Sequence, residues 1–404
     1  MKDPSRVRVA GPLEPYARGF CAELARQGYA RSSAVEQLKL VAHLSRWMSG
    51  ESLSAGELTA ERVEQFVAAR RAGGRRQFLS PRGLRPLSGY LARLGVAGPA
   101  PQVVASPAGM LVERYRAYLI GERGLAAGTV RYYERVARRF LSRTSSGEAL
   151  DAGGLTTGDV SRFVLDECRF RSVGSAKTVV MALRSLLGYL YLEGLTATAL
   201  AGAVPAVAPW RSASLPRTLD AAGLARLLAG CDRRGATGRR DFAILMLLAR
   251  LGLRAGEVAA LCLDDIDWRA GEMVVRGKGD RQELLPLPAD VGEAVASYLR
   301  RGRQRVECRR LFLRVHAPTA GLSGDGVTNV VRAACRRAGL PVVGARRLRH
   351  FAATQTLRQG ASLAEVGQLL RHRSSFSTQI YAKVDQAALR QVARSWTGGA
   401  RWCG

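Results

Sequence analysis

Polar residues in the C-terminal half of the chain have types and spacings that suit the binding of a phosphate group. Arg254 lies between two apolar segments, and Glu257 three residues later can fix the arginine side chain. An ion pair with a purely structural role explains these two residues equally well. Arg346, Arg349 and His350 have the i, i+3 and i+4 spacing of one helix face, which predicts a surface that attracts an anion.

A lysine, a second histidine and a tyrosine add groups that can transfer protons or act as a nucleophile. Lys278 lies in Gly-Lys-Gly between two apolar runs, which predicts a hairpin with this lysine at its tip. A solvated lysine is the ordinary explanation, yet only five of the 62 basic residues are lysine, and lysine can give up a proton where arginine cannot. His372 and Tyr381 follow a helix that begins with a Ser362-x-x-Glu365 capping box.

Together these positions resemble the catalytic domain of the tyrosine recombinases, the phage integrase family, over residues 215–393. The resemblance implies a site-specific DNA recombinase or integrase, carried by a transposon or a phage, that cleaves and rejoins DNA through a covalent 3′-phosphotyrosyl intermediate. It implies that no metal ion and no cofactor is needed. The catalytic residues that the resemblance assigns are Arg254, Lys278, Arg346, Arg349, His372 and the nucleophile Tyr381.

The chemistry of phosphoryl transfer explains why these residue types belong together. Displacement at phosphorus places more negative charge on the equatorial oxygens, and preorganised cations stabilise that state. The resemblance implies that Arg254 and Arg349 bind the two non-bridging oxygens. It implies that His372 forms a hydrogen bond to the phosphate and that Lys278 donates the proton to the leaving 5′ oxygen. Nearby cations are expected to lower the pKa of Tyr381 from its usual value near ~10.

One position departs from the family pattern. Three residues before the second arginine the family usually has histidine, whereas this chain has Arg346. Arginine can bind a phosphate, but its pKa above ~12 prevents it from acting as a base at neutral pH. His350 is not assigned as the replacement base, because the family commonly has histidine at that position too. Three explanations for the proton loss of Tyr381 stay open: His372 as the base, direct stabilisation of the phenolate by the cations, or a milder role for the position of Arg346 than its usual identity implies.

A repeat and the apolar periodicity predict the elements that position these residues. The pattern of residues 58–67 recurs at 155–164, and that of 84–91 recurs at 183–190. Both copies have apolar residues at helical spacing, which predicts two similar helical bundles. The C-terminal part opens with helices over 220–229 and 241–251. It passes through a β-like run at 271–275 and returns to helix.

The expected fold class is mainly α, with a small β-hairpin or sheet (α+β) in the catalytic domain and SAM-like helical bundles before it. Proline-rich linkers separate the parts. The expected parts are an N-terminal helical repeat of the core-binding fold (1–98), a core-binding SAM-like domain (108–200), a catalytic domain (215–393) and a C-terminal tail (394–404).

Composition points to a polyanionic partner. The 404 residues include 62 Lys plus Arg against 33 Asp plus Glu, a net charge of +29 that favours double-stranded DNA. Candidate DNA contacts are Lys177, Arg184 and Arg281. No stretch approaches the ~18 apolar residues that a membrane span needs, and the seven scattered cysteines form no zinc motif. We expect a cytoplasmic protein that acts at the bacterial nucleoid and makes no membrane contact.

The family's working assembly is a homotetramer on two DNA sites, in which residues 390–404 are the candidate segment for docking onto a neighbour. Companion recombinases or accessory DNA-bending proteins are open additions. Three other functions account for parts of the sequence. A non-catalytic helix-turn-helix regulator fits residues 362–381 but leaves Lys278 and both arginine motifs unexplained. A type IB topoisomerase has a similar active site, and a decayed recombinase would account for Arg346.

Overall fold

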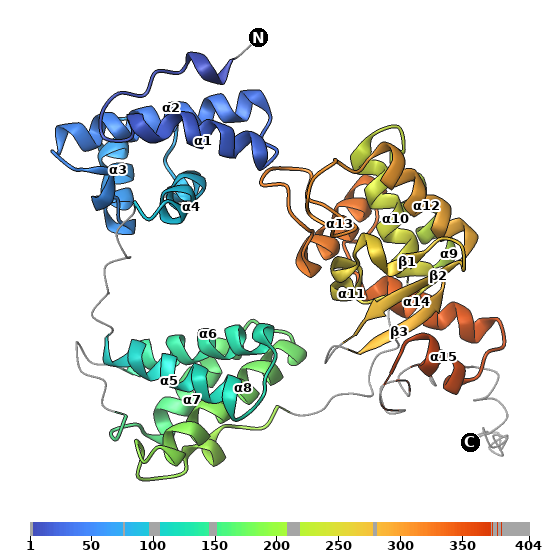
Figure 1. The fold of residues 1–404 in the computed structure, drawn as a ribbon. Helices are drawn as coiled ribbons and strands as arrows, with labels where there is room; N and C mark the ends of the chain where they lie inside the picture. Colours follow the sequence, from blue (N-terminus) through green and yellow to red (C-terminus); the bar gives the residue numbers. More distant parts are fainter. Residues whose placement is uncertain are drawn as a thin grey trace, which may run out of the picture. The chain divides into compact units, whose positions relative to one another are not determined.

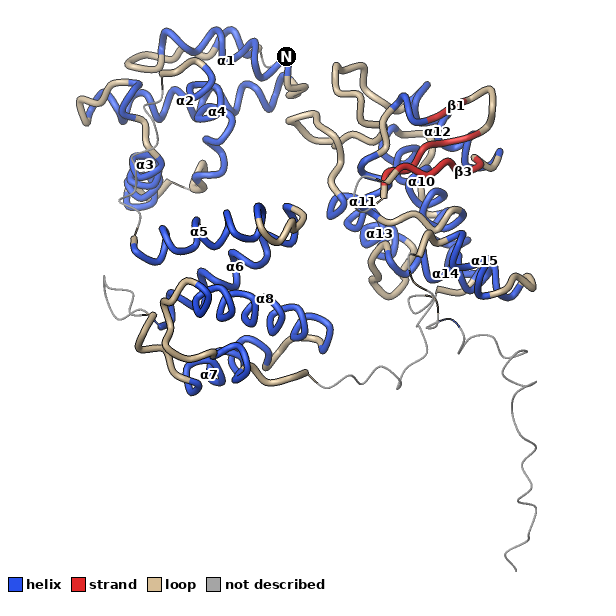
Figure 2. The backbone as a smooth tube through the Cα atoms, turned by 60° about the horizontal axis from the view of Figure 1, so that its bottom comes forward, coloured by secondary structure: helices blue, strands red, loops and turns tan. Residues whose placement is uncertain are grey.

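The computed structural model describes residues 3–75, 77–96, 106–144, 152–207, 219–277 and 281–372, together with Ser374, Thr378 and Tyr381. Two compact units are present: Met1–Ser54, Phe66–Arg93 and Ala213–Gly404 form one, and Ala55–Gln65 and Leu94–Ser212 form the other. The C-terminal part alone contains strands among the described residues (Figures 1 and 2). The expected fold class, mainly helical with one small sheet, is confirmed.

The first helical segment contains α1 (Glu14–Arg26), α2 (Arg31–Gly50), α3 (Ala60–Ala72) and α4 (Arg85–Arg93). Helix α1 packs against α2 and α4 through side chains at helical spacing. The ring of Phe20 in α1 lies 5.6 Å from that of Tyr90 in α4, and Trp47 in α2 lies 5.7 Å from Phe66 in α3. A small aromatic and aliphatic core therefore holds these helices together.

The second helical segment contains α5 (Pro107–Gly121), α6 (Ala127–Thr144), α7 (Thr157–Cys168) and α8 (Val173–Leu192). Phe140 of α6 and Phe163 of α7 meet edge to face, with ring centroids 5.2 Å apart. Helix α7 begins with a capping box in which Thr156 and Asp159 satisfy each other's backbone amide groups. Buried Tyr115 donates its hydroxyl to Ser185 over 2.9 Å, so its polar end is satisfied inside the core.

The helices of the two segments follow one another at nearly constant sequence offsets. Helix α6 starts 96 residues after α2, and α7 starts 97 residues after α3. The fourth helices differ, because α8 begins at Val173 whereas α4 begins only at Arg85, after a 3-10 turn at Pro81–Leu84. The sequence repeat thus corresponds to a repeated order of four helices.

The C-terminal part packs helices around one long buried helix. The helices before the sheet are α9 (Ala221–Ala229), α10 (Ala236–Arg250) and α11 (Ala255–Ala260). Those after it are α12 (Ala289–Arg301), α13 (Gly324–Arg337), α14 (Arg346–Arg358) and α15 (Leu363–Leu369). Helix α10 contacts α12, α13 and α14 through side chains that include Ile244 and Leu248, both fully buried. These contacts fix α14 against the core, and α14 carries the second arginine motif.

A three-stranded antiparallel sheet with order β1-β2-β3 covers one side of this core. The strands are β1 (Ile266–Asp267), β2 (Glu272–Arg276) and β3 (Gln282–Pro286), and Val274 of β2 is opposite Leu284 of β3. The predicted hairpin is therefore present. Lys278, which was expected at its tip, lies outside the described residues.

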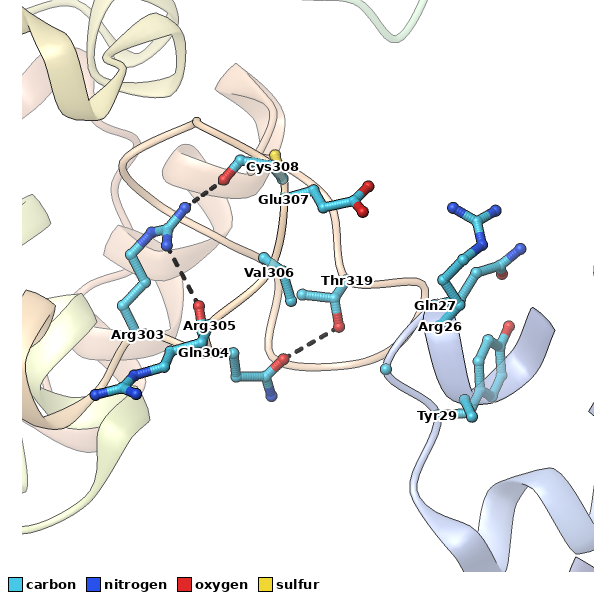
Figure 3. A pocket seen from close by; sticks show the side chains of 12 residues that line it. Arg26, Gln27, Tyr29, Arg303, Gln304, Arg305, Val306, Glu307, Cys308 and Thr319 are labelled. Atoms are coloured by element: carbon cyan, nitrogen blue, oxygen red, sulfur yellow. Dashed lines mark hydrogen bonds between the residues drawn. The ribbon is translucent and has the colours of Figure 1, made fainter. Parts of the chain in front are cut away.

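The connection after α12 is held by an arginine. Arg303 donates hydrogen bonds to the carbonyl oxygens of Gln304 and Cys308, and Thr319 donates its hydroxyl to the Gln304 side chain over 3.1 Å (Figure 3). Arg303 also donates to the carbonyl oxygen of Arg310. These bonds tie the loop together before α13 begins.

Among the described helices, none has the length and apolar character that a membrane crossing requires.

Candidate active site

A left-handed glycine shapes the junction between α10 and α11. Gly252 has φ +59, a conformation that other residues rarely adopt, and a Cβ built there would lie 2.9 Å from Cδ2 of Leu370. The turn brings the Gly252 carbonyl oxygen to Arg349, whose Nη1 donates to it over 2.5 Å. It also sets Arg254 at the N-cap of α11. The local backbone thus brings the two predicted arginines to one site.

Arg349 is a buried cation anchored to backbone. Only 6% of its surface is exposed, and Nη2 donates to the carbonyl oxygen of Leu370 at the end of α15. Burial, together with the charges of Arg254 and Arg371, lowers the pKa of Arg349 to about 10. The guanidinium therefore remains charged at neutral pH. A bound phosphate would reduce its repulsion with the neighbouring cations.

Glu257 pairs with two arginines. Its carboxylate accepts from Nη1 of Arg254 over 2.5 Å and from Nη2 of Arg371 over 2.9 Å. Burial alone would raise the pKa of Glu257, but the Arg254 backbone amide and the two guanidinium charges hold it below its usual value. The predicted pairing of Arg254 with Glu257 is observed. Arg254 stays 42% exposed in its side chain, so it can still reach a ligand.

Tyr381 lies against α14, with its hydroxyl 2.6 Å from Nδ1 of His350. The residue is only 1% exposed, in an apolar cluster with Ala353, Leu357, Val366 and Leu370. Burial raises the pKa of Tyr381, although the charges of Arg349 and Arg346 oppose this shift. The expectation of a lowered pKa is therefore wrong for this conformation, because desolvation outweighs the nearby cations.

His372 follows α15 and contacts Thr378, with 2.9 Å between its Nδ1 and the Thr378 hydroxyl. Burial and then the charges of Arg349 and Arg254 lower the pKa of His372 to about 4. His372 is consequently neutral at pH 7 and can donate or accept a hydrogen bond. Arg254 donates to the carbonyl oxygen of Arg371 over 3.4 Å and Arg349 donates to that of Leu370, so both predicted arginines contact the segment that leads directly to His372.

Arg346 occupies the first turn of α14, where it is exposed. Its charge contributes to the lowered pKa values of His350 and His372 and opposes the rise in the pKa of Tyr381. Five of the six predicted catalytic residues therefore gather around the N-terminal half of α14. The sixth, Lys278, lies outside the described residues.

Two of the three candidate DNA contacts lie on α8, and the third lies next to β3. Lys177 is half-buried in α8, while Arg184 is exposed on the same helix and donates to the Val204 carbonyl oxygen over 2.8 Å. Arg281 is exposed directly before β3, where its carbonyl oxygen accepts from Gly277. None of these positions belongs to the cluster around α14.

Two further polar residues lie in the cluster. Arg371 is 6% exposed in its side chain and pairs with Glu257, and His350 contacts the Tyr381 hydroxyl. A signal for Arg371 exists in the sequence, since arginines flank His372 on both sides. The helix-face spacing marks His350, but no local signal predicts its contact with Tyr381, which spans 31 residues. Among the described residues, no group of three His, Cys, Asp or Glu side chains could hold a metal ion.

Known proteins resemble this chain along most of its length. Residues 217–388 match the phage integrase family, and residues 112–194 match the N-terminal SAM-like domain of phage integrases. The protein named integrase/recombinase y4rA of Sinorhizobium fredii is 39% identical over 397 residues, which cover 97% of this chain and 96% of that protein. Tyrosine recombinase XerD of Mycobacterium tuberculosis is 34% identical over 305 residues, which cover 71% of this chain and 96% of that protein.

A solved structure shares the fold. A lambda integrase tetramer bound to a Holliday junction has a TM-score of 0.52 and 17% sequence identity, covering 78% of this chain and 88% of that chain. Fold and site together define an integrase-type catalytic domain that follows a SAM-like helical domain. The chain belongs to the phage integrase family, as the resemblance of its motifs implied.

Proposed function

We propose that this protein is a site-specific tyrosine recombinase that cleaves and rejoins double-stranded DNA through a 3′-phosphotyrosyl intermediate. Family membership supports the reaction class, and the net charge of +29 supports a polyanionic substrate. The observation that carries the proposal is the convergence on one helix: Arg349 of α14 donates to the Gly252 carbonyl next to the Arg254 turn, while Tyr381 contacts the following residue, His350.

The roles we assign follow from charge and hydrogen-bonding capacity. Arg254 and Arg349 bind the two non-bridging oxygens of the scissile phosphate, because planar guanidinium groups match an oxyanion pair. Arg346 adds a third cation at the exposed end of α14. His372, neutral at pH 7, donates a hydrogen bond to the phosphate. All these contacts strengthen as charge develops in the transition state.

Tyr381 attacks phosphorus, its oxygen forms a bond to the 3′ phosphate, and the bond from phosphorus to the 5′ oxygen breaks. We assign the proton for that 5′ oxygen to Lys278, by its position in Gly-Lys-Gly. One phosphoester replaces another, so a different 5′ hydroxyl can reverse the step without an energy source. No step in this scheme passes through a metal ion or cofactor.

We further infer that residues 108–200 form a core-binding domain, that residues 215–393 form the catalytic domain, and that residues 1–98 are an additional copy of the core-binding fold. Lys177, Arg184 and Arg281 are proposed DNA contacts. A homotetramer on two DNA sites is the proposed assembly, in line with the lambda integrase tetramer on a Holliday junction. In a cell, such an enzyme acts on DNA at the nucleoid.

Suicide substrates test this function. Nicked duplexes that tile the sequence flanking the chain's own gene lose a short fragment on cleavage, which traps the covalent intermediate. The wild-type protein is expected to form a denaturant-resistant adduct with at least one duplex, as is Tyr191→Phe, a control on an exposed tyrosine of α8. Tyr381→Phe is expected to form none. Non-covalent binding alone by the wild-type protein would indicate a DNA-binding regulator instead.

A leaving-group test addresses Lys278. With a sulfur atom in place of the bridging 5′ oxygen, the leaving group needs no proton, so Lys278→Ala is expected to regain most of its cleavage rate. Persistent loss of cleavage on that substrate would remove the proton-donor role from Lys278. Relaxation of plasmid DNA that lacks every captured sequence would favour the topoisomerase alternative.

A further inference from the structure

The hydroxyl of Tyr381 has a partner that none of the roles above uses. Nδ1 of His350 lies 2.6 Å from this hydroxyl, and the imidazole and phenol rings have centroids 5.4 Å apart. Both residues are at least nine-tenths buried, so bulk water does not compete for the contact. Among the described residues, an imidazole nitrogen is therefore the hydrogen-bond partner of the nucleophilic oxygen.

The charge state of His350 decides which atom donates. Burial first, and then the charges of Arg346, Arg347 and Arg349 and of the ring of His372, lower the pKa of His350 to about 4. The ring is consequently neutral at pH 7. In a neutral ring the tautomer sets the direction of the hydrogen bond: with the proton on Nε2 the phenol donates to Nδ1, and with the proton on Nδ1 the ring donates to the phenol oxygen. Our inference takes the Nε2–H tautomer, in which the Nδ1 lone pair accepts from the phenol.

The other candidate acceptors are less suitable. Arg346, at the position where the family usually has histidine, is a guanidinium with donors only. His372 uses its Nδ1 for the contact with Thr378. Carboxylates could accept a proton, but Glu257, the buried carboxylate of the cluster, is engaged with Arg254 and Arg371. The chain therefore has no base at the position of Arg346, whereas His350 offers an imidazole nitrogen next to the Tyr381 hydroxyl.

We propose that His350 is the general base of this enzyme, and this inference rests on the proposed recombinase function. As the Tyr381 oxygen bonds to phosphorus, its O–H bond breaks and the proton moves to Nδ1 of His350, which becomes an imidazolium. The 5′ oxygen leaves with a proton from the general acid. In the rejoining step the same proton returns from Nδ1 to the phenol, so the cycle consumes no proton.

Local charges make this transfer depend on bound DNA. Without a phosphate, Arg346, Arg347 and Arg349 disfavour a further positive charge on His350, and burial disfavours the phenolate. The proton therefore stays on Tyr381 in the free enzyme. A phosphodiester bound at Arg349 adds negative charge next to the ring and offsets that penalty. The nucleophile is thereby kept inactive until a substrate phosphate arrives.

Two substitutions separate proton transfer from positioning. His350→Gln retains an amide oxygen that can accept from the Tyr381 hydroxyl but cannot take its proton, whereas His350→Phe removes both properties. The proposal expects His350→Gln to lower the rate of adduct formation by about 10²–10⁴-fold at pH 7. His316→Gln, on an exposed histidine of the same part, is the control and should cleave normally. Normal cleavage by His350→Gln would overturn the base assignment and leave only a positioning role.

Two further readouts exclude an indirect effect. The difference in cleavage rate between wild-type protein and His350→Gln should become smaller as the pH rises towards the pKa of the phenol, because hydroxide can then remove the phenolic proton. A sulfur leaving group should restore cleavage by Lys278→Ala but not by His350→Gln, because it removes the need for a general acid and not the need for a general base. Equal rescue of both variants would contradict the proposal.

A spectroscopic measurement needs no cleavage. With four histidines in the chain, ¹⁵N NMR can assign each ring, and His350 should be the Nε2–H tautomer at pH 7, with an Nδ1 shift that changes in Tyr381→Phe. An Nδ1–H tautomer would overturn the inference. Absence of any adduct with wild-type protein would count against the recombinase function, whereas normal cleavage by His350→Gln counts against His350 alone.

Discussion

Glu257 and Arg371 form an ion pair across 114 residues of sequence, with 2.9 Å between Oε2 and Nη2. The side chains are only 4% and 6% exposed, respectively. The pair connects α11, which follows Arg254, to the segment that carries His372. It therefore couples the positions of two proposed phosphate-binding groups that are distant in sequence.

Removing the carboxylate charge should destabilise the catalytic part. In Glu257→Gln, Arg371 remains charged and buried and loses its closer carboxylate partner, while Glu283 stays 3.7 Å from its Nε. A loss of about 3–5 kcal/mol in the free energy of unfolding is expected. The matched control is Glu293→Gln, on an exposed carboxylate of α12, which should change stability by less than about 0.5 kcal/mol. Denaturant titration measures both variants. Equal stability of the two would show that the buried pair contributes little.

The left-handed turn at Gly252 gives a second prediction. Gly252→Ala forces a Cβ to within 2.9 Å of Leu370, whereas Gly271→Ala, at φ +66, meets nothing within 4 Å. Both substitutions place an alanine in a left-handed conformation, so the difference between their free energies of unfolding measures the steric contact alone. We expect that difference to be about 1–3 kcal/mol. Thermal or denaturant unfolding gives that difference. Similar stabilities would mean that Leu370 moves aside freely.

The charge of Arg346 should lower the pKa values of His350 and His372. In Arg346→Gln, the pKa values of His350 and His372, both lowered to about 4, are expected to rise towards the usual 6.5 because one nearby positive charge is lost. Arg358→Gln, an exposed arginine in the last turn of the same helix, is the control and should shift neither. NMR titration of the ring protons measures the pKa values. Unchanged values in Arg346→Gln would remove this arginine from the electrostatics of the site.

Stability should depend on pH through His350. Its folded pKa of about 4 lies below the unfolded value near 6.5, so the unfolded chain binds more protons between these pH values. The free energy of unfolding should therefore fall as pH is lowered from 6.5 to 4, and His350→Gln should flatten part of that slope. His316→Gln is the control on an exposed histidine. An identical slope in wild-type protein and His350→Gln would show that the buried ring is not protected from protonation.

Local signals in the sequence were sufficient to predict two helices of the C-terminal part and the hairpin. The helix expected at 220–229 is α9, with Asp220 as its N-cap, because both the apolar spacing and the cap are local features. The helix expected at 241–251 starts earlier, at Ala236, since its first turn carries Gly238 and two arginines and has no apolar face. The β-like run at 271–275 is β2, displaced by one residue.

The site could be predicted only in part. Its cations follow from residue type and family resemblance, whereas the contact of His350 with Tyr381 depends on how the chain returns after α15 to pack on α14. The same packing buries Tyr381, and burial reverses the pKa shift expected from the nearby cations alone. Such effects arise from tertiary desolvation, which residue spacing does not encode.

Mass spectrometry of the trapped intermediate tests the central claim most directly. After capture on a nicked duplex and digestion of protein and DNA, one peptide should carry a nucleotide, attached at Tyr381 through the 3′ phosphate. The released strand should end in a 5′ hydroxyl. A nucleotide on another residue, or a 5′-phosphate linkage to Tyr381, would contradict the proposed mechanism.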